Sequence, residues 1–358
     1  MHVAHLMIGT TPFPHDWADS VSNFARVTRL GLGFCDRPNV TYVRRLKLRP
    51  KRLFAPVNDL TDTAQLVRAI KAQGRRSGEA IELLHGHFYP SAHKLAGAAR
   101  SMRLPLVVTE HSSAMTGNAA EHKQLSAGGL RRAASLYERA DVVLAVSAYL
   151  ARCIAERTGV QAEVVPNPVD VELFRPGVPD DDLHVVFVGR LAADKRPDLL
   201  LRGVALARQQ LPLRLSIVGD GPDRAQVSAL IRELELEASV TMTGRVPREE
   251  VARIVGRAHF GVSTSLVETF GVAAAECCAA GIPMVAPDQP PFDEVLPESG
   301  RLLFDPASPA SLAGAIIEAA DRSWDGDAIR DSIVERFSPT AVAKRLEGIY
   351  RQVLRRTS

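Results

Sequence analysis

The feature that most constrains the fold is a regular alternation of short apolar runs and helical patterns through the second half of the chain. Each apolar run has the length of a buried strand, and the segments between most of the runs show helical periodicity. Strands that alternate with helices build a parallel sheet with helices on both faces. We therefore predict an α/β domain with a doubly wound sheet, whose strands cover residues 185–188, 213–218, 239–243, 260–264, 283–286 and 301–304.

The first half of the chain shows the same alternation less regularly. Its predicted helices include 60–73 and 130–139, and its predicted strands are 3–8, 40–43, 81–84, 106–109, 142–146 and 163–165. A stretch rich in proline and aspartate, 175–182, predicts a linker. Because 358 residues suit two compact domains, we predict α/β domains over 1–176 and 183–337, facing each other across a cleft.

Two glutamates, Glu268 and Glu276, lie in the segment 265–286, S-L-V-E-T-F-G-V-A-A-A-E-C-C-A-A-G-I-P-M-V-A. Glu276 is surrounded by small apolar residues, where an unpaired carboxylate is strongly unfavourable, so a polar partner must reach it. Gly271 and Gly281 are placed to begin and end the helix, which leaves the amides of 270–272 available to a phosphate-sized anion. Since carboxylates repel phosphate, we expect both glutamates to bind neutral hydroxyls of a sugar or ribose.

Positive charge for such a phosphate follows the apolar run 185–188. This run predicts a buried strand that ends at Gly189, with Arg190 and Lys195 on the loop beyond its carboxyl end. Ligands of open α/β sheets bind in the crevice at that end. A planar guanidinium together with a compact ammonium suits a diphosphate. The combined pattern predicts a nucleotide-sugar site.

Several motifs in one order resemble a known family. They are G-R-x-x-x-x-K at 189–195, G-D-G-P at 219–222, E-T-F-G at 268–271 and the second glutamate, Glu276, preceded by L-H-G-H-F at 84–88, V-V-T-E-H-S-S at 107–113, A-V-S at 145–147 and V-P-N-P-V-D-x-x-x-F-x-P at 165–176. The chain resembles the retaining glycosyltransferases of family 4 over about residues 81–321, and the shared order makes the resemblance specific. The resemblance implies the GT-B fold, with two Rossmann-like domains, and a last helix over 338–358 that crosses back to the first domain.

The resemblance also implies roles for matching residues. Arg190 and Lys195 would hold the donor diphosphate, Glu268 the sugar hydroxyls, Glu276 the ribose, and His111 would lie beside the reacting sugar. The implied catalytic residues are His111, Arg190, Lys195 and Glu268. The implied donor-binding residues are Gly189, Arg190, Lys195, Gly219, Gly244, Arg245, Val246, Glu268, Thr269, Phe270, Gly271, Val272 and Glu276, with 244–246 against the nucleobase.

The implied reaction moves a sugar from a nucleoside diphosphate sugar, carrying UDP or GDP, to a hydroxyl acceptor with retention at the anomeric carbon. Fixed positive charge stabilises the leaving diphosphate, so we expect neither a metal nor another cofactor. A lipid-linked glycan, a polysaccharide and a small metabolite all stay open as acceptors. The alternatives are a nucleotide-sugar epimerase, a phosphorolytic enzyme and a non-catalytic sugar-nucleotide binding protein.

The sequence departs from the family near Asp19 and Ser20. The family has a paired-glycine loop after its first strand, close to the acceptor and the diphosphate, whereas this chain has Ala18, Asp19 and Ser20 before a predicted helix over 21–30. Few residues then separate that helix from the next strand, so a strand or loop is expected to be trimmed. How this half handles its acceptor stays open.

Composition excludes several classes of protein. The formal net charge of +3 is too small to indicate a nucleic-acid partner, and no apolar run approaches the length of a membrane span. The start of the chain lacks the pattern of a secretory signal, and the four cysteines show no C-x-x-C spacing. We therefore expect a reduced, cytoplasmic protein.

Three other patterns have simpler interpretations. We expect the rings of His85 and His87 to point to opposite faces of a strand, which argues against a metal site. Asp180 and its two acidic neighbours are expected to be a solvated charge run in the linker. Basic residues with interleaved leucines allow either peripheral contact with an anionic membrane or a solvated edge strand; they are Arg44, Arg45, Lys47, Arg49, Lys51 and Arg52.

Overall fold

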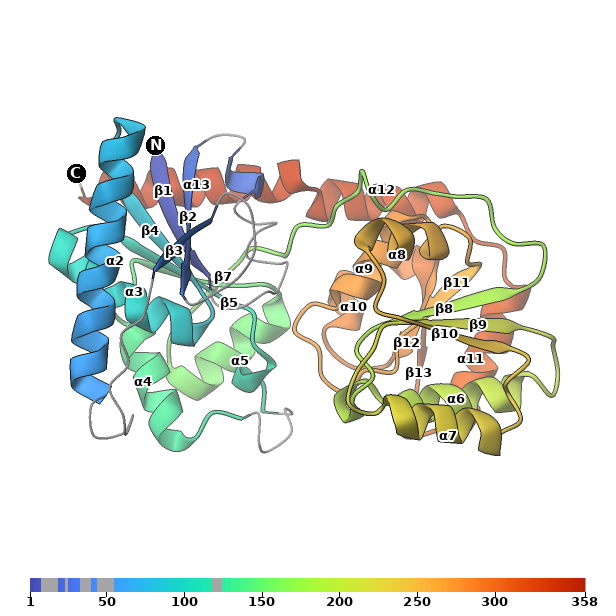
Figure 1. Cartoon of the computed structure of the whole chain (residues 1–358). Coiled ribbons are helices and arrows are strands. Elements are labelled where there is room, and N and C mark those ends of the chain that lie inside the picture. The colour runs from blue at the N-terminus through green and yellow to red at the C-terminus, as the bar shows by residue number, and fades with distance from the viewer. Residues whose placement is uncertain (8–18, 23–24, 33–39, 44–54, 118–123, 358) are drawn as a thin grey trace. The chain divides into compact units, whose positions relative to one another are not determined.

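The computed structural model describes residues 1–7, 19–22, 25–32, 40–43, 55–117 and 124–357. The chain divides into two compact units. Unit 1 contains residues 1–168 and 339–358, and unit 2 contains residues 169–338. Each unit is built on a parallel sheet flanked by helices (Figure 1), which confirms the predicted α/β fold class.

In unit 1 the described strands form a seven-stranded sheet in the order β3-β2-β1-β4-β5-β6-β7. The strands are β1 (His2–Met7), β2 (Arg26–Leu32), β3 (Val40–Val43), β4 (Leu83–His87), β5 (Leu106–Glu110), β6 (Val142–Ala145) and β7 (Glu163–Val164). Its helices are α2 (Ala55–Ser77), α3 (Tyr89–Met102), α4 (Ala127–Tyr137) and α5 (Ala148–Thr158), with α13 (Pro339–Thr357) from the end of the chain. Ser126 and Ser147 cap α4 and α5 by accepting from Gly129 N and Leu150 N.

The predicted helix over 21–30 is wrong. Residues 26–32 form strand β2, which pairs in parallel with β1 and β3. The described part of the chain between the first strand and 40–43 therefore contains a strand, β2. The apolar residues of this stretch fit a helical spacing as well as an extended one, and a run this short cannot be assigned by periodicity alone. Pairing with two neighbouring strands decides the conformation.

In unit 2 six parallel strands form a sheet in the order β10-β9-β8-β11-β12-β13. They are β8 (His184–Val188), β9 (Arg214–Val218), β10 (Val240–Gly244), β11 (Phe260–Val262), β12 (Met284–Pro287) and β13 (Arg301–Phe304). The helices are α6 (Pro197–Ala207), α7 (Arg224–Glu233), α8 (Arg248–Val255), α9 (Val272–Ala279), α10 (Phe292–Val295), α11 (Pro309–Asp321) and α12 (Gly326–Phe337). Figure 1 shows α6, α7 and α11 on one face of the sheet, with α8, α9 and α12 on the other.

The strand order of unit 2 reverses between β8 and β11, which are neighbours in the sheet. All the strands are parallel, so the loops that follow these two strands leave the same edge side by side. Such a switch point is the usual ligand position in an open α/β sheet. The predicted residues Arg190 and Lys195 follow β8, and Glu268 follows β11.

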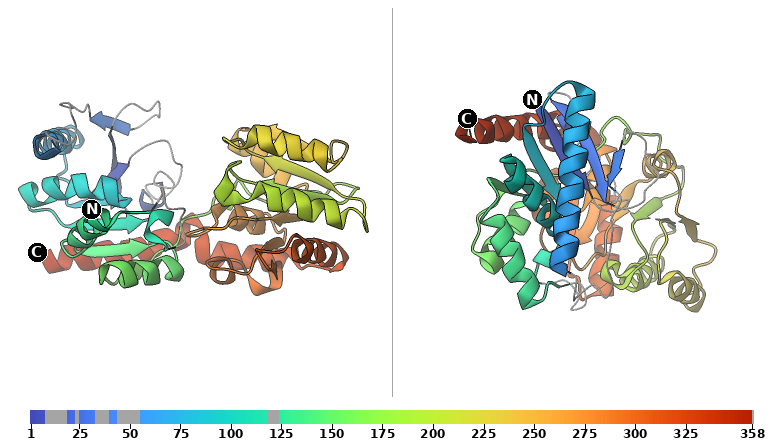
Figure 2. Two further views of the ribbon diagram at one scale, coloured as in Figure 1. Left: turned by 90° about the horizontal axis from the view of Figure 1, so that it is seen from below. Right: turned by 60° about the vertical axis from the view of Figure 1, so that its left-hand side comes forward.

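The last helix belongs to unit 1 (Figure 2). Val342, Leu346, Tyr350 and Val353 are buried on one face of α13. The Tyr350 hydroxyl lies 2.5 Å from Nδ1 of His85 on β4. Side-chain packing and this polar contact therefore attach the end of the chain to the sheet of unit 1.

The first segment of unit 1 ends at Pro168, eight residues before the predicted end of the first domain at 176, and unit 2 begins at Val169. Val169 N donates to Phe337 O at 2.8 Å, and Arg330 on α12 donates to the carbonyls of Val171 and Phe174, also at 2.8 Å. These contacts hold residues 169–174 against the helices of unit 2. They explain why the division falls before the proline-rich stretch rather than within it.

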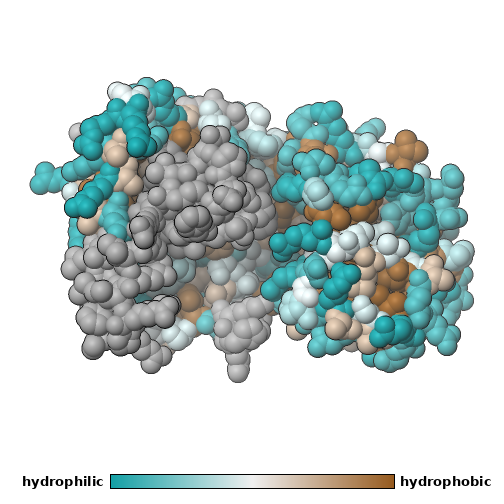
Figure 3. Space-filling view, viewed as in Figure 1, coloured by the Kyte–Doolittle hydropathy of each residue, from teal (hydrophilic) through white to brown (hydrophobic). Residues whose placement is uncertain are grey.

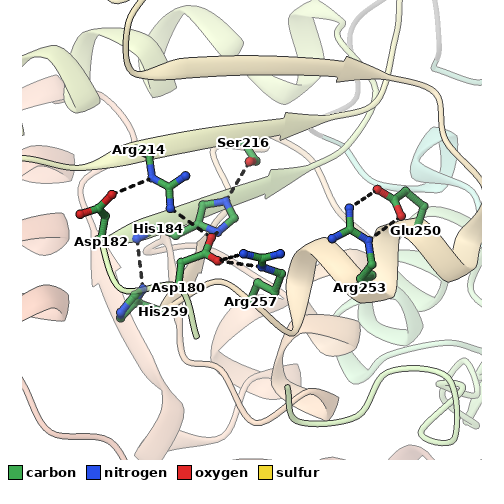
Figure 4. Close-up of polar contacts among 9 residues, drawn as sticks. All are labelled: Asp180, Asp182, His184, Arg214, Ser216, Glu250, Arg253, Arg257 and His259. Atoms are coloured by element: carbon green, nitrogen blue, oxygen red, sulfur yellow. Dashed lines mark hydrogen bonds and ion pairs between the residues drawn. The ribbon is translucent and has the colours of Figure 1, made fainter. Parts of the chain in front are cut away.

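The expectation that Asp180 is solvated is wrong. Its side chain is 8% exposed, and its carboxylate pairs with Arg214, Arg257 and His184 (Figure 4). Burial alone would raise the pKa of Asp180, but its hydrogen bond with Arg257 and the surrounding positive charges hold the pKa below its ordinary value. Asp180 therefore connects the segment that precedes β8 to Arg214 on β9 and to Arg257, which follows α8.

No helix within the described part of the chain is long and apolar enough to cross a membrane. Hydrophilic residues cover much of the face of unit 2 seen in Figure 3. The basic segment 44–52 lies outside the described residues. Its contact with a membrane, like the cytoplasmic location, stays a prediction.

We expect Gly203→Val to destabilise unit 2. A Cβ at Gly203 on α6 would lie 2.5 Å from Leu312 Cδ2 on the neighbouring helix α11, and overpacking of this kind costs about 1–3 kcal/mol. Thermal unfolding of the variant should show a lower midpoint. The matched control is Gly314→Ala on α11, where an added Cβ meets nothing within 4 Å and higher helix propensity should leave the midpoint equal or raised. An unchanged midpoint for Gly203→Val would contradict the described α6–α11 packing.

Candidate active site

Close backbone approach shapes the switch point of unit 2. Gly219 follows β9 with φ of +139°, and a Cβ at this position would lie 2.0 Å from the carbonyl oxygen of Gly189. Gly189 N donates to Val218 O, and Gly219 N to Gly244 O, both at 3.0 Å. Only glycine fits Gly219, because both its φ and its neighbour exclude a side chain. The ends of β8, β9 and β10 are thereby held together.

The two predicted cations follow β8 in a short loop. Arg190 Nη2 donates to Asp194 Oδ1 at 3.1 Å, and its side chain is 53% exposed. Lys195 ends the 3₁₀ turn Ala193–Lys195, and its ammonium forms an ion pair with Oε1 of Glu268. Both side chains of this pair are about one-fifth exposed. The structure therefore brings Lys195 and Glu268 together from the loops after β8 and β11.

Backbone contacts fix the relative position of these two loops. Thr264 Oγ1 donates to Lys195 O at 2.7 Å, and Leu266 N donates to Asp194 O at 2.9 Å. The Lys195–Glu268 pair thus rests on a hydrogen-bonded frame and does not depend on two mobile side chains alone. Preorganisation of this kind is what a charge-stabilising site needs.

Helix α9 begins beside Glu268. Gly271 is its N-cap with φ of +82°, which suits glycine. Phe270 is buried and packs edge-on against Phe337, with ring centroids 5.1 Å apart. The first helical bonds to Gly271 O come from Ala274 N and Ala275 N. The amides before Ala274 are therefore not used in the hydrogen bonds of the helix.

Glu276 lies on α9 with a protein partner that the sequence did not indicate. Its Oε1 is 3.0 Å from Nη2 of Arg248, the first residue of α8. The Glu276 side chain is 11% exposed and that of Arg248 is 38% exposed. The polar group that a buried carboxylate requires is thus supplied, at least in part, by Arg248. In the sequence, Arg248 lies in the pattern P-R-E-E that follows Val246. This pattern favours the first turn of a helix, but it does not indicate a contact with Glu276.

The remaining predicted donor residues surround this group in unit 2. Gly244 ends β10 with φ of +70°, Arg245 is exposed, and Val246 is partly buried. Thr269 and Val272 flank the N-cap of α9 and are also partly buried. The loops after β8, β10 and β11 therefore carry most of the predicted set, with Glu276 on the helix that follows.

His111 lies in unit 1, directly after β5. It is 7% exposed, with Nδ1 3.1 Å from Asn167 Oδ1 and Nε2 3.0 Å from Nδ1 of His87. Burial lowers the pKa of His111 to about 3, although the hydrogen bond with Asn167 acts in the opposite direction. His111 is therefore a neutral imidazole at physiological pH, and both ring nitrogens have partners within unit 1.

A buried carboxylate supports the backbone at His111. Glu110 is fully buried and accepts hydrogen bonds from Tyr137 Oη and from the amides of Tyr89, His111 and Ser112, at 2.7–3.0 Å. Burial raises the pKa of Glu110, and these four donors oppose that effect. Sequence reasoning missed Glu110, although it lies within the motif V-V-T-E-H-S-S. Its four donors fix the turn that presents His111.

The expected orientation of His85 and His87 is wrong. Their rings stack with centroids 4.4 Å apart, because residues two apart in a strand share a face of the sheet. His85 is bound by Tyr350 Oη and by Thr109 Oγ1, the latter at 2.6 Å. Among the described residues no group of three or more histidine, cysteine or acidic side chains is arranged to hold a metal ion.

The departure from the family near Asp19 is only partly described. Residues 19–21 are helical, while residues 8–18 lie outside the described part of the chain. The predicted departure from the paired-glycine loop of the family, which concerns the loop after β1, therefore stays a prediction.

Solved structures share the whole architecture. A sucrose-phosphate synthase from Thermosynechococcus elongatus matches with a TM-score of 0.77 at 23% identity, covering 98% of both chains. The Anabaena protein HepE, in complex with UDP and glucose, matches with a TM-score of 0.79 at 19% identity, covering 98% of this chain and all of that one. Two Rossmann-like units with polar residues at a sheet switch point thus define a protein of the GT-B fold class.

Two family models match consecutive parts of the sequence. The model described as Glycosyltransferase Family 4 matches residues 24–173, and the model described as Glycosyl transferases group 1 matches residues 169–331. Together they span most of the chain, which therefore belongs to the family 4 glycosyltransferases and is an enzyme of that class.

Curated relatives agree with this assignment. The D-inositol 3-phosphate glycosyltransferase of Acidothermus cellulolyticus is 29% identical, over 94% of this chain and 83% of its own length. A phosphatidylinositol N-acetylglucosaminyltransferase component from Arabidopsis thaliana is 27% identical over 77% of this chain. The match spans 63% of the length of that plant protein.

The low pKa of His111 predicts a pH-dependent stability. Folded His111 stays neutral between its ordinary pKa of 6.5 and about 3, while the unfolded chain binds a proton there. Its contribution is therefore complete above pH 6.5 and is lost as the pH falls. Relative to His111→Gln, the wild type should lose up to about 1.4 kcal/mol per pH unit below pH 6.

Thermal unfolding of both proteins from pH 7 to pH 5 measures this difference. His93→Gln is the control, because His93 is exposed on α3 and should leave the wild-type pH dependence unchanged. Parallel pH curves for the wild type and His111→Gln would show that His111 is not buried as described.

Proposed function

We propose that this chain transfers a sugar from a UDP- or GDP-linked donor to a hydroxyl acceptor, with retention at the anomeric carbon and without a metal ion. Unit 2 binds the donor in this proposal. Arg190 and Lys195 hold the diphosphate, Glu268 binds hydroxyls of the transferred sugar, and Glu276 binds the ribose.

The ion pair between Lys195 and Glu268 is the observation that carries the proposal. It places one cation and one anion side by side at the switch point, next to the N-terminus of α9. A sugar diphosphate needs this combination, since its phosphates require positive charge and its sugar hydroxyls require acceptors. The ligand would replace the direct pair with one contact between its phosphates and Lys195 and another between its sugar hydroxyls and Glu268.

The same charges act on the leaving group during the reaction. Negative charge grows on the diphosphate as the anomeric bond breaks, so fixed donors that meet this charge lower the barrier. Arg190, Lys195 and the first amides of α9 supply such donors. In a retaining reaction of this type the acceptor attacks from the side of the leaving group, and the departing phosphate takes its proton.

His111 is proposed to lie beside the reacting sugar. A neutral imidazole would not repel the developing positive charge at the anomeric carbon, and the low pKa of His111 supports this form. The turn fixed by Glu110 would hold the histidine in place.

The names of relatives suggest which substrates to test first. HepE was solved with UDP and glucose, which supports uridine nucleotides as donors. The two curated relatives are named for inositol 3-phosphate and for phosphatidylinositol. We therefore propose inositol phosphates as the first acceptors to assay, ahead of polysaccharides and other small metabolites.

Removal of either cation should slow turnover strongly. We expect Arg190→Ala and Lys195→Ala each to reduce turnover by about a hundredfold or more, because each removes a donor to the leaving diphosphate. Arg202→Ala removes the same charge from an exposed position on α6 and should leave turnover within about twofold, as distant surface charges are screened. Equal rates for all three variants would refute the assignment of the site.

The release of free nucleoside diphosphate separates transfer from the alternatives. A transferase should release UDP or GDP from the sugar nucleotide in proportion to added acceptor. An epimerase would convert the donor without acceptor, and a binding protein would do neither. Full activity in excess chelator is expected, and activity abolished by chelator but restored by magnesium would contradict the metal-free mechanism.

A further inference from the structure

Arg248 contacts the proposed ribose carboxylate and is still accessible to a ligand. Its Nη2 lies 3.0 Å from Glu276 Oε1, and 38% of its side chain is exposed, against 11% for Glu276. The guanidinium is therefore the more exposed partner of this ion pair, and it contacts the carboxylate directly.

A second contact fixes the guanidinium. The Cζ atom of Arg248 lies 5.7 Å from the ring centroid of Phe174, which is 1% exposed. Arginine over an aromatic face is favourable, and the contact limits the positions that its long side chain can occupy. Arg248 is thus held between an aromatic ring and a carboxylate.

Arg330 links the backbone of Phe174 to the end of the helix that carries Glu276. Its guanidinium donates to the carbonyls of Phe174 and Val171, each at 2.8 Å, and to the carbonyl of Ala279, the last residue of α9. Arg330 therefore holds Phe174 next to the helix that carries Glu276. Arg248, at the start of α8, contacts both the ring of Phe174 and the carboxylate of Glu276.

This arrangement sets the orientation of the carboxylate. A guanidinium presents its N–H groups in a rigid plane, and a carboxylate oxygen that accepts one of them can accept further hydrogen bonds. Nearby positive charge also favours the ionised form of a carboxylate in a helix of small apolar residues. Without Arg248, Glu276 would lose a partner that holds both its direction and its charge.

We propose that Arg248 is a positioning residue for nucleotide recognition, which orients ionised Glu276 to accept hydrogen bonds from the ribose hydroxyls. The inference rests on the proposed function, in which Glu276 binds the ribose. Its consequence concerns substrate class, because the Arg248–Glu276 pair would select ribonucleotides over 2′-deoxyribonucleotides at a point remote from the diphosphate.

Calorimetric titration of UDP against dUDP, and of GDP against dGDP, tests this consequence. The wild type should bind its preferred ribonucleotide at least about tenfold more tightly than the deoxy form, the scale of a hydrogen bond to a charged group. Arg248→Ala should reduce this ratio to below about threefold. Glu276→Gln should have a similar effect, and Arg248→Lys an intermediate one, since lysine keeps the charge but not the planar fork.

Arg253→Ala is the matched control, because Arg253 lies on the same helix and forms an ion pair with Glu250, away from Glu276, with 57% of its side chain exposed. It should keep the wild-type ratio. Circular dichroism and thermal unfolding check that each variant is folded. If Arg248→Ala weakens the binding of the ribonucleotide and of the deoxyribonucleotide equally and keeps the ratio of their affinities, Arg248 has no positioning role. That result would contradict this inference and leave the proposed function unaffected. If the folded wild type binds none of the four nucleotides, both the proposed function and this inference are contradicted.

Discussion

Acidic and basic side chains lie in pairs just before helix α9 and on it, and the candidate site of unit 2 depends on this pairing. Glu268 is paired with Lys195 at the start of the helix, and Glu276 is paired with Arg248 along it. The carboxylates are only 21% and 11% exposed, and charges that are largely removed from solvent are tolerated only when opposite charge or hydrogen bonds accompany them. We propose that the same paired charges are what a ligand with both anionic phosphates and neutral hydroxyls would contact.

In unit 1 the buried polar groups at the end of β5 are stabilised by hydrogen bonds. Glu110 is surrounded by four hydrogen-bond donors, and His111 is kept neutral by burial between Asn167 and His87. The turn after β5 is consequently rigid and uncharged at the position of the histidine. In the proposed function this uncharged imidazole is the group of unit 1 assigned to the transferred sugar, and Arg190 and Lys195 of unit 2 are the groups assigned to the diphosphate.

The sequence predicted the sheet of unit 2 well because both faces of that sheet are covered, so its strands appear as continuous apolar runs. Residues 26–30 were assigned to a helix because their spacing also fits one, and only pairing with β1 and β3 decides between the two. The pattern of the motifs predicted Lys195 and Glu268 beside one ligand. It did not predict Arg248 as the partner of Glu276, because no motif relates these two residues, which are 28 positions apart and meet only through their side chains in the folded unit. Asp180 was misjudged for the same reason, since its three partners come from separate elements.

The most direct test of the account is a crystal structure of the enzyme with UDP bound. Phosphate oxygens are predicted within hydrogen-bonding distance of Arg190 and Lys195, with the ribose hydroxyls on the carboxylate of Glu276 and the ion pair between Lys195 and Glu268 opened. A nucleotide bound elsewhere, or one that leaves both ion pairs intact and untouched, would contradict the central claim that these paired charges form the donor site.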